Sequence, residues 1–355
     1  MSNSIETIPI NYILSKNRSG STLLNNLINN HPNLISIPEE NVYWLLKKEY
    51  GHIRQFSEQQ LHLFLDDLYF LLTKSEHKFS EYIFPKKEEL YNIIINEKVN
   101  LSFLNVSKLI YLNTIYALSK DRSSISQIVN KEIQFNHLIP VIKKELSLSK
   151  FIVLIRDPRA NIYSSLRTQP NRKNLVYHAK KWVLENTPLI FHQENENTLF
   201  IKYEELVANP EHILSKIFNF LGVEPKPAGI QNTSFASDST IQEFFKNLSI
   251  SKAKTDLFNK YHFGSVSKID SEKTTEWKTK KVFSESELRK IEFICSDLAN
   301  QFGYEMPFKK VRLSITDYFH IFLAKLDYYV ACKYILMPVK LKKLLRSINF
   351  LNFYQ

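Results

Sequence analysis

The chain has 355 residues, of which 44% are hydrophobic and 13% are aromatic, and its net charge is +11. This apolar content can fill a substantial core, and with only 6 glycines the composition excludes a wholly disordered or collagen-like chain. A basic surplus is typical of proteins that bind nucleic acid, an anionic membrane or an anionic ligand.

The chain begins with a pattern of strand, loop and helix. The apolar run 8–14 is typical of a buried strand, residues 15–21 form a polar loop, and residues 22–28 have apolar positions at helical spacing. Unpaired N–H groups at the start of such a helix point into the loop, so this order of elements is suited to binding an anion. A second short apolar stretch, 34–37, follows His31-Pro32.

The middle of the chain predicts helices, and the second half alternates strands with helices. From Trp44 to Ile142 apolar residues recur three and four positions apart, which is mainly a helical pattern. Residues 150–155 give the strongest strand signal, and Pro158 is suited to the first turn of the next helix. The later elements are a strand at 198–201, a helix ending near Gly222, a polar loop over 259–280 and a helix over 284–302. Short strands separated by helices predict an α/β fold with a mostly parallel sheet.

The loop after the first strand differs from a Walker A loop, which has a Lys directly after its second glycine. Here Gly20 is the one glycine of the loop, Ser21 and Thr22 follow it, and the basic residue Arg18 precedes it. An ordinary ATP or GTP site is therefore disfavoured. A phosphate-type anion still fits, because Gly20 lets the backbone approach and the two hydroxyls offer hydrogen bonds.

This loop resembles the 5′-phosphosulfate loop of sulfotransferases, which use 3′-phosphoadenosine 5′-phosphosulfate (PAPS) as sulfonate donor. The segment Arg18-Ser-Gly-Ser-Thr-Leu-Leu24 and the pair His31-Pro32 carry the resemblance. It implies that the 5′ end of the cofactor is bound by Arg18, Ser19, Gly20, Ser21 and Thr22.

A second segment resembles the 3′-phosphate site of the same family. Arg156 follows the strand at 150–155, and Ser164 lies two helical turns later, so both side chains can address one dianion. Further matches occur in the family's order over about residues 8 to 308, namely 202–210 with Tyr203, 276–278 and 302–304. The resemblance implies that Tyr203 contacts the cofactor, although a tyrosine here can also be an ordinary core aromatic.

The closer similarity is to the bacterial and tyrosylprotein-type sulfotransferases, and it implies the catalytic residues. An acidic residue shortly after His-Pro acts as general base in those enzymes, which implies Glu39, with its neighbour Glu40 as the alternative. Lys131 matches a lysine that precedes the 3′-phosphate arginine, and with Arg18 it would stabilise charge on the transferred group. Glu39 can instead cap the helix that follows, and Lys131 can be a solvated helix residue.

The resemblance also extends to a segment near residue 265. Ser265 and Lys268 match a Ser-x-Ser-Lys segment that reaches the cofactor, although both lie in a polar loop where such residues are common. One departure is Glu276, which stands where the family has a lysine; Lys273 or Lys278 can substitute for it. His52 and His137 are alternative bases, although lone histidines are usually structural or exposed.

We therefore predict a PAPS-dependent sulfotransferase with a P-loop-like, three-layer α/β core. Residues 1–308 form the sulfotransferase domain, in which a mainly helical insert at 44–145 shapes the acceptor cleft. The acceptor presents a hydroxyl on a carbohydrate, a lipid, a small metabolite or a tyrosine, and no metal is required. The alternatives are a P-loop-type small-molecule or nucleotide kinase, which would need Mg²⁺ and the Lys that this loop lacks, and a non-catalytic nucleotide-binding protein.

The basic surplus lies mainly in residues 309–355, where nine Lys and Arg face two Asp, a net charge of +7. This terminal position, without a nucleic-acid motif, disfavours binding to nucleic acid. Residues 314–337 and 341–351 predict amphipathic helices, which we expect to pack on the rest of the chain or on another chain; the alternative is a peripheral membrane contact. Cys295 and Cys332 form no disulfide framework, and no secretory signal or membrane-spanning stretch is visible, so we expect a cytoplasmic protein, with the inner membrane surface as a further possibility.

Overall fold

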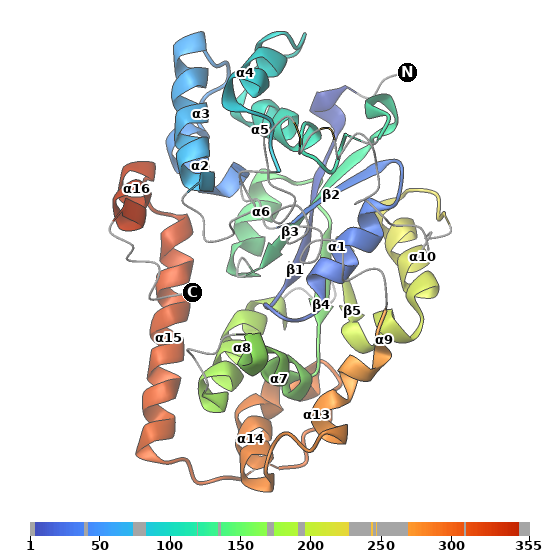
Figure 1. Cartoon of the computed structure of the whole chain (residues 1–355), viewed down its shortest axis with the longest axis vertical. Helices are drawn as coiled ribbons and strands as arrows, with labels where there is room; N and C mark the ends of the chain where they lie inside the picture. The colour runs from blue at the N-terminus through green and yellow to red at the C-terminus, as the bar shows by residue number, and fades with distance from the viewer. Residues whose placement is uncertain are drawn as a thin grey trace.

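The centre of the computed structural model is a five-stranded sheet in which every strand pair is parallel, in the order β2-β3-β1-β4-β5 (Figure 1). The structure describes residues 4–38, 42–73, 83–118, 120–133, 136–168, 174–190, 196–226, 243, 246, 269–308 and 310–347. The strands are β1 (Ile10–Ser15), β2 (Leu34–Pro38), β3 (Gln127–Ile133), β4 (Phe151–Ile155) and β5 (Thr198–Lys202). The predicted α/β class with a parallel sheet is confirmed.

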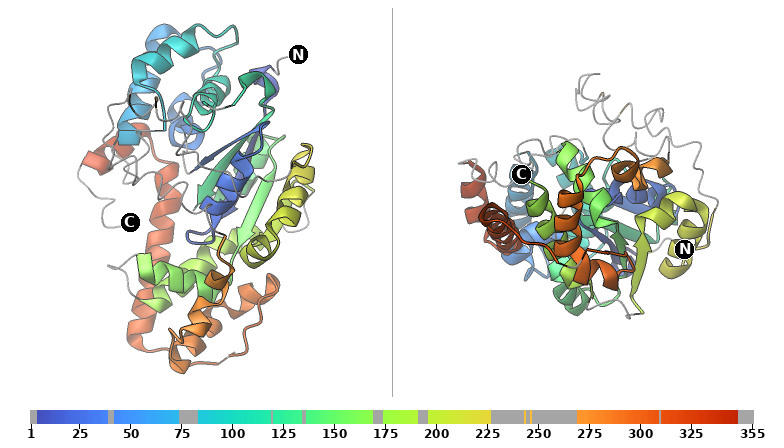
Figure 2. Two further views of the ribbon diagram at one scale, coloured as in Figure 1. Left: turned by 45° about the vertical axis from the view of Figure 1, so that its right-hand side comes forward. Right: turned by 90° about the horizontal axis from the view of Figure 1, so that it is seen from below.

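Helices surround the sheet (Figures 1 and 2). They are α1 (Ser21–Asn29), α2 (Val42–Tyr50), α3 (Glu58–Thr73), α4 (Lys87–Ile95), α5 (Phe103–Leu112), α6 (Ile139–Glu145), α7 (Pro158–Thr168), α8 (Leu175–Ile190), α9 (Tyr203–Ala208), α10 (Pro210–Leu221), α13 (Glu276–Thr279), α14 (Glu285–Gln301), α15 (Ile315–Ile335) and α16 (Val339–Ser347). Pro158 opens α7 and Gly222 ends α10 with a φ of 81°, as the sequence predicts.

Both faces of the sheet are buried, which gives the predicted three layers. Successive residues of a strand point to opposite faces. Ile13 of β1 packs with apolar residues of α1, α9 and α10, whereas Tyr12 and Leu14 belong to the core on the other face, with residues of α5, α6 and α8. Strands covered on both sides are nearly continuous apolar runs, which is why β1 and β4 are readable in the sequence.

The strand β3 corrects the sequence analysis, which expected a mainly helical pattern from Trp44 to Ile142. The helices α2 to α6 fulfil that expectation, but residues 127–133 form a strand between β1 and β2. Its polar residues Asn130, Lys131 and Glu132 hide the strand pattern, although all three are buried. Buried polar groups need partners, and Asn130 Nδ2 donates to the Tyr111 hydroxyl at 3.1 Å and to Glu132 Oε1 at 2.8 Å.

The C-terminal helices lie against the rest of the chain. The helix α15 packs along α8, and α16 packs against α2 and α3. Lys342 is fully buried, and its Nζ donates to the backbone oxygens of Leu45 at 2.5 Å and Ile335 at 2.9 Å. The two expected helices are thus present; α16 is amphipathic, whereas α15 has apolar residues around its whole circumference. The domain division at residue 308 stays a prediction. Within the described ranges, no helix has both the length and the hydropathy to cross a membrane.

Candidate functional site

The loops that follow β1 and β4 meet at the carboxyl edge of the sheet. These strands are neighbours, but the chain leaves β1 toward β2 on one side and leaves β4 toward β5 on the other. Such a point, where the strand order reverses, is the usual ligand site of an open α/β sheet. Arg156 Nη1 donates to the backbone oxygen of Arg18 at 3.0 Å, and Arg18 Nε donates to Ser164 Oγ at 3.2 Å. The structure therefore brings together three residues from two segments that the sequence assigned to the two ends of one cofactor.

The loop before α1 is shaped by two residues with positive φ and by contacts with α7. Arg18 and Gly20 have φ values of 69° and 93°, and the helix begins at Ser21 with no side chain capping it. Asn161 on α7 donates to the backbone oxygen of Asn17 at 2.9 Å and to Ser19 Oγ at 3.2 Å. The uncapped helix start suits an anion, because its N–H groups lack intrahelical partners and the helix dipole favours negative charge there. Asn161 was not among the predicted site residues, although its position on the helix that follows Arg156 is a signal in the sequence.

Gly20 is required by the approach of Tyr203. A Cβ built on Gly20 would lie 2.3 Å from Cδ2 of the Tyr203 ring, well inside van der Waals contact. The Arg156 guanidinium also lies over this ring, 4.4 Å from its centroid. Tyr203, one of the predicted cofactor contacts, thus touches both halves of the site and sets their spacing.

We expect Gly20→Ala to destabilise the protein by more than the cost of a positive φ alone. The matched control is Gly222→Ala, because Gly222 has a φ of 81° but nothing within 4 Å of a built Cβ. The control should cost about 1–2 kcal/mol in the free energy of unfolding, whereas Gly20→Ala adds a clash that must displace Tyr203. Urea denaturation of both variants measures the difference, and equal losses would contradict a packing role for Tyr203.

Arg156 is a buried cation that forms no direct ion pair with a carboxylate of the described residues. It is only 7% exposed, and its Nη1 and Nη2 donate to the backbone oxygens of Arg18 and Lys273, the latter at 2.7 Å. Its Nε has no hydrogen-bond partner among the described residues. Burial lowers the pKa of the guanidinium, while Tyr203 and Glu204 oppose that shift. Because a buried charge is costly unless paired, this arrangement favours an anionic ligand.

Lys131 is not a solvated helix residue, which was the alternative in the sequence analysis. It lies on β3, is 2% exposed, and its Nζ donates to Thr22 Oγ1 at 3.2 Å. In the sheet Lys131 pairs with Pro38, the last residue of β2. The Lys131 side chain is therefore held beside the start of α1. Its backbone lies next to β2, the strand that precedes Glu39 in the chain.

Glu204, in the segment after β5, supports the backbone next to Arg156. Its Oε1 accepts a hydrogen bond from the Asp157 N–H at 3.0 Å, and the Tyr304 hydroxyl donates to Oε2 at 2.8 Å. Burial raises the pKa of Glu204. This carboxyl therefore fixes the backbone directly after Arg156, a positioning role that the sequence analysis did not assign.

Four predicted residues lie outside the described ranges: Glu39, Glu40, Ser265 and Lys268. Glu276, the departure from the family pattern, forms ion pairs with Arg167 at 3.2 Å and Lys280 at 2.5 Å. The proposed substitute Lys273 contributes its backbone oxygen to Arg156.

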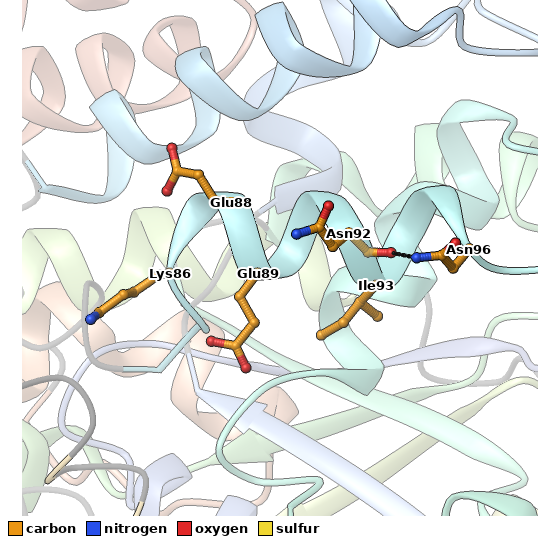
Figure 3. Close-up of a pocket in the computed structure, with 6 residues that line it drawn as sticks. All are labelled: Lys86, Glu88, Glu89, Asn92, Ile93 and Asn96. Atoms are coloured by element: carbon orange, nitrogen blue, oxygen red, sulfur yellow. Dashed lines mark hydrogen bonds between the residues drawn. The ribbon is translucent and has the colours of Figure 1, made fainter.

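A surface hollow elsewhere does not fit an anionic ligand. Its lining comes from α4 and the residue before it (Figure 3), and comprises Lys86, Glu88, Glu89, Asn92, Ile93 and Asn96. The carboxylates Glu88 and Glu89 point to different sides of the helix in this view. In the part of the chain that the structure describes, no group of His, Cys, Asp and Glu is arranged to hold a metal ion.

Comparison with known proteins decides the family. The sequence profile described as "Sulfotransferase family" matches residues 9–227. This chain is a member of the sulfotransferase family. The match includes the loop before α1, Lys131, Arg156, Ser164 and Tyr203, so the predicted resemblance is confirmed.

Individual relatives of this sulfotransferase agree with the assignment. A Caenorhabditis briggsae protein named "Putative protein-tyrosine sulfotransferase" is 28% identical over 167 residues, which cover 43% of this chain and 60% of that relative. The match thus spans less than two thirds of the relative's length. The sulfotransferase domain of the curacin biosynthetic pathway has a TM-score of 0.50 and 23% identity, covering 84% of this chain and 99% of that domain. The domain of the Synechococcus PCC 7002 olefin synthase has a TM-score of 0.52 and 20% identity, covering 84% and 96%. Both share the fold.

Proposed function

We propose that this sulfotransferase moves the sulfonate group of PAPS to a hydroxyl of an acceptor. The observation that carries the proposal is the buried Arg156, which forms no direct ion pair with a carboxylate of the described residues, beside an uncapped helix start. The residues fit a nucleotide with a phosphate at each end. Arg156 Nε has no hydrogen-bond partner among the described residues, and Gly20 leaves room only for backbone beside Tyr203. Cationic and hydroxyl groups such as Arg18 and Thr22 lie at the same loop, and they are suited to phosphate oxygens.

Two groups of residues would hold the donor. Arg156 and Ser164 would bind the 3′-phosphate, and the N–H and hydroxyl groups of residues 19–22 would bind the 5′ end. When bound, PAPS supplies the sulfonate and a phosphate leaving group. Arg18 and Lys131 place positive charge beside the loop, where it would stabilise the charge that develops during transfer, by analogy with phosphoryl transfer.

Glu39 is the proposed general base, with Glu40 as the alternative. A neutral alcohol is a weak nucleophile, so a carboxylate that takes its proton assists attack. Support for Glu39 comes from the chain: it directly follows Pro38, whose neighbour in the sheet is Lys131. Ser265 and Lys268 remain proposed cofactor contacts.

The acceptor is proposed only as a hydroxyl-bearing molecule. A tyrosine is one candidate, because the Caenorhabditis briggsae relative is named for protein tyrosine; carbohydrates, lipids and small metabolites present the same O–H group. We place the enzyme in the cytoplasm, as its two free cysteines, Cys295 and Cys332, favour a reducing compartment.

A transfer assay with a cell extract tests the function. The full chain is incubated with PAPS carrying labelled sulfonate, in the presence and absence of EDTA, and in parallel with labelled ATP. We expect label from PAPS to reach an extract component equally with and without EDTA. EDTA-sensitive transfer from ATP alone would establish the kinase alternative, and nucleotide binding without transfer would establish a non-catalytic binding protein.

A further inference from the structure

The outer face of α15 is rich in apolar side chains from Ile315 to Tyr329. Six large side chains on this face are between 41% and 90% exposed: Ile315, Tyr318, Phe319, Phe322, Leu326 and Tyr329. Steps of three and four residues place them on one side of the helix. We call this surface the α15 stripe. Contiguous exposed apolar surface of this kind marks an interaction site.

The opposite face of α15 holds the helix on the protein through polar contacts. Its buried residues include Asp317 and Asp327. Asp317 Oδ2 lies 2.8 Å from Lys290 Nζ, and Asp327 accepts a hydrogen bond from the Tyr177 hydroxyl. Ala324 and Ile335 are buried on this face as well, so α15 has apolar side chains on its outward face in addition to its inward one. Figures 1 and 2 show α15 at the margin of the molecule, away from the sheet.

The charge around the stripe is positive. Asp317 and Asp327 are the two acidic residues of the whole segment 309–355, and both are buried. Lys325 and Lys333 on α15 are exposed, as are Lys310 before it and Lys340 after it. Folding thus removes the acids from the surface and leaves lysines beside aromatic and aliphatic side chains.

We propose that α15 docks this protein on an anionic lipid surface. Aromatic and aliphatic residues on one face, flanked by lysines, are typical of helices that lie in the plane of the headgroup boundary. A second copy of the chain fits less well, because two stripes face to face would bring like charges together with no exposed acid on either helix. This inference concerns a surface apart from the nucleotide site and does not depend on the proposed donor.

Flotation of the full chain with lipid vesicles tests the proposal. The vesicles are phosphatidylcholine alone and phosphatidylcholine mixed with phosphatidylglycerol. We expect flotation with the mixed vesicles, and a loss of about tenfold or more in partitioning for Phe322→Glu, which removes apolar burial and adds a negative charge. Leu148→Glu is the matched control, because Leu148 is 75% exposed and lies outside α15; it should float like the unmodified chain.

A second pair of substitutions tests whether the lysines of α15 contribute to binding of anionic lipid. Lys325→Gln and Lys333→Gln should each lower partitioning to the anionic vesicles by about fivefold. Thermal unfolding and calorimetry with 3′-phosphoadenosine 5′-phosphate (PAP) should be unchanged by Phe322→Glu, which separates this inference from the function proposed above. Absence of flotation, equal flotation of Phe322→Glu and Leu148→Glu, or equal binding to both vesicle types would overturn it. A dimer in sedimentation that Phe322→Glu dissociates, without flotation, would instead assign the stripe to a second copy.

Discussion

Arg156→Ala is expected to weaken the binding of PAP by about 10- to 150-fold, because a hydrogen bond to a charged group contributes about 1.5–3 kcal/mol. The guanidinium is 7% exposed and forms no direct ion pair with a carboxylate of the described residues, so a bound phosphate would be in direct contact with a buried positive charge. Loss of the bond from Arg156 to the Arg18 backbone would also loosen the loop before α1. Titration calorimetry with PAP measures the effect.

Two further variants distinguish a direct contact between Arg156 and the phosphate from a general effect of removing positive charge. Arg167→Ala removes an arginine from the same helix as Ser164, but Arg167 is 59% exposed and pairs with Glu276; its PAP affinity should stay within about twofold, since surface ion pairs contribute little. Arg156→Lys keeps the charge and loses the planar fork of donors, so its affinity should be intermediate. Unchanged PAP affinity in an Arg156→Ala protein with a normal circular dichroism spectrum would refute the 3′-phosphate assignment.

Glu39→Gln should lower turnover by about 10²–10⁴ and leave PAP affinity unchanged, because general base catalysis contributes about that factor. Glutamine is nearly the same size as glutamate and cannot accept the proton of an alcohol. Steady-state transfer from labelled PAPS, together with calorimetry on the same preparation, distinguishes loss of chemistry from loss of binding.

Glu40→Gln is the matched control for this prediction, since it makes the same change one position later. We expect it to retain most of the turnover. If Glu40→Gln lost turnover and Glu39→Gln kept it, Glu40 would be the base, and if both kept it the base would lie elsewhere in the chain.

Local patterns predicted much of the fold. The apolar runs of β1 and β4, Pro158 at the start of α7 and Ser284 at the start of α14 are signals contained within a few residues. The strand β3 has no such signal, because its buried Asn130 and Glu132 belong to a hydrogen-bond network with Tyr111, which lies on a different element. The periodicity of apolar residues in a sequence predicts which apolar side chains are buried. It does not predict the burial of polar residues whose hydrogen-bond partners lie far along the chain.

The candidate site likewise has parts that the sequence predicted and parts that depend on the tertiary structure. The loop before α1 and the segment starting at Arg156 were recognisable as separate anion-binding patterns, since each depends on residues close in sequence. The two segments form one site because of the strand order, which places β4 beside β1. This order brings Arg18 into contact with Ser164 and Gly20 into contact with Tyr203. Asn161 and Glu204 acquire their positioning roles only from these long-range contacts.

The sequence by itself determined that residues 309–355 carry the surplus charge and that the segment forms helices rich in apolar residues. It could not determine which side of α15 faces outward, because a helix with apolar residues all around has no single inward face. The tertiary structure decided this through Lys290 and Tyr177, which pair with Asp317 and Asp327 and bury them. A buried carboxylate must find a partner, and satisfying these two left the aromatic and basic side chains on the surface.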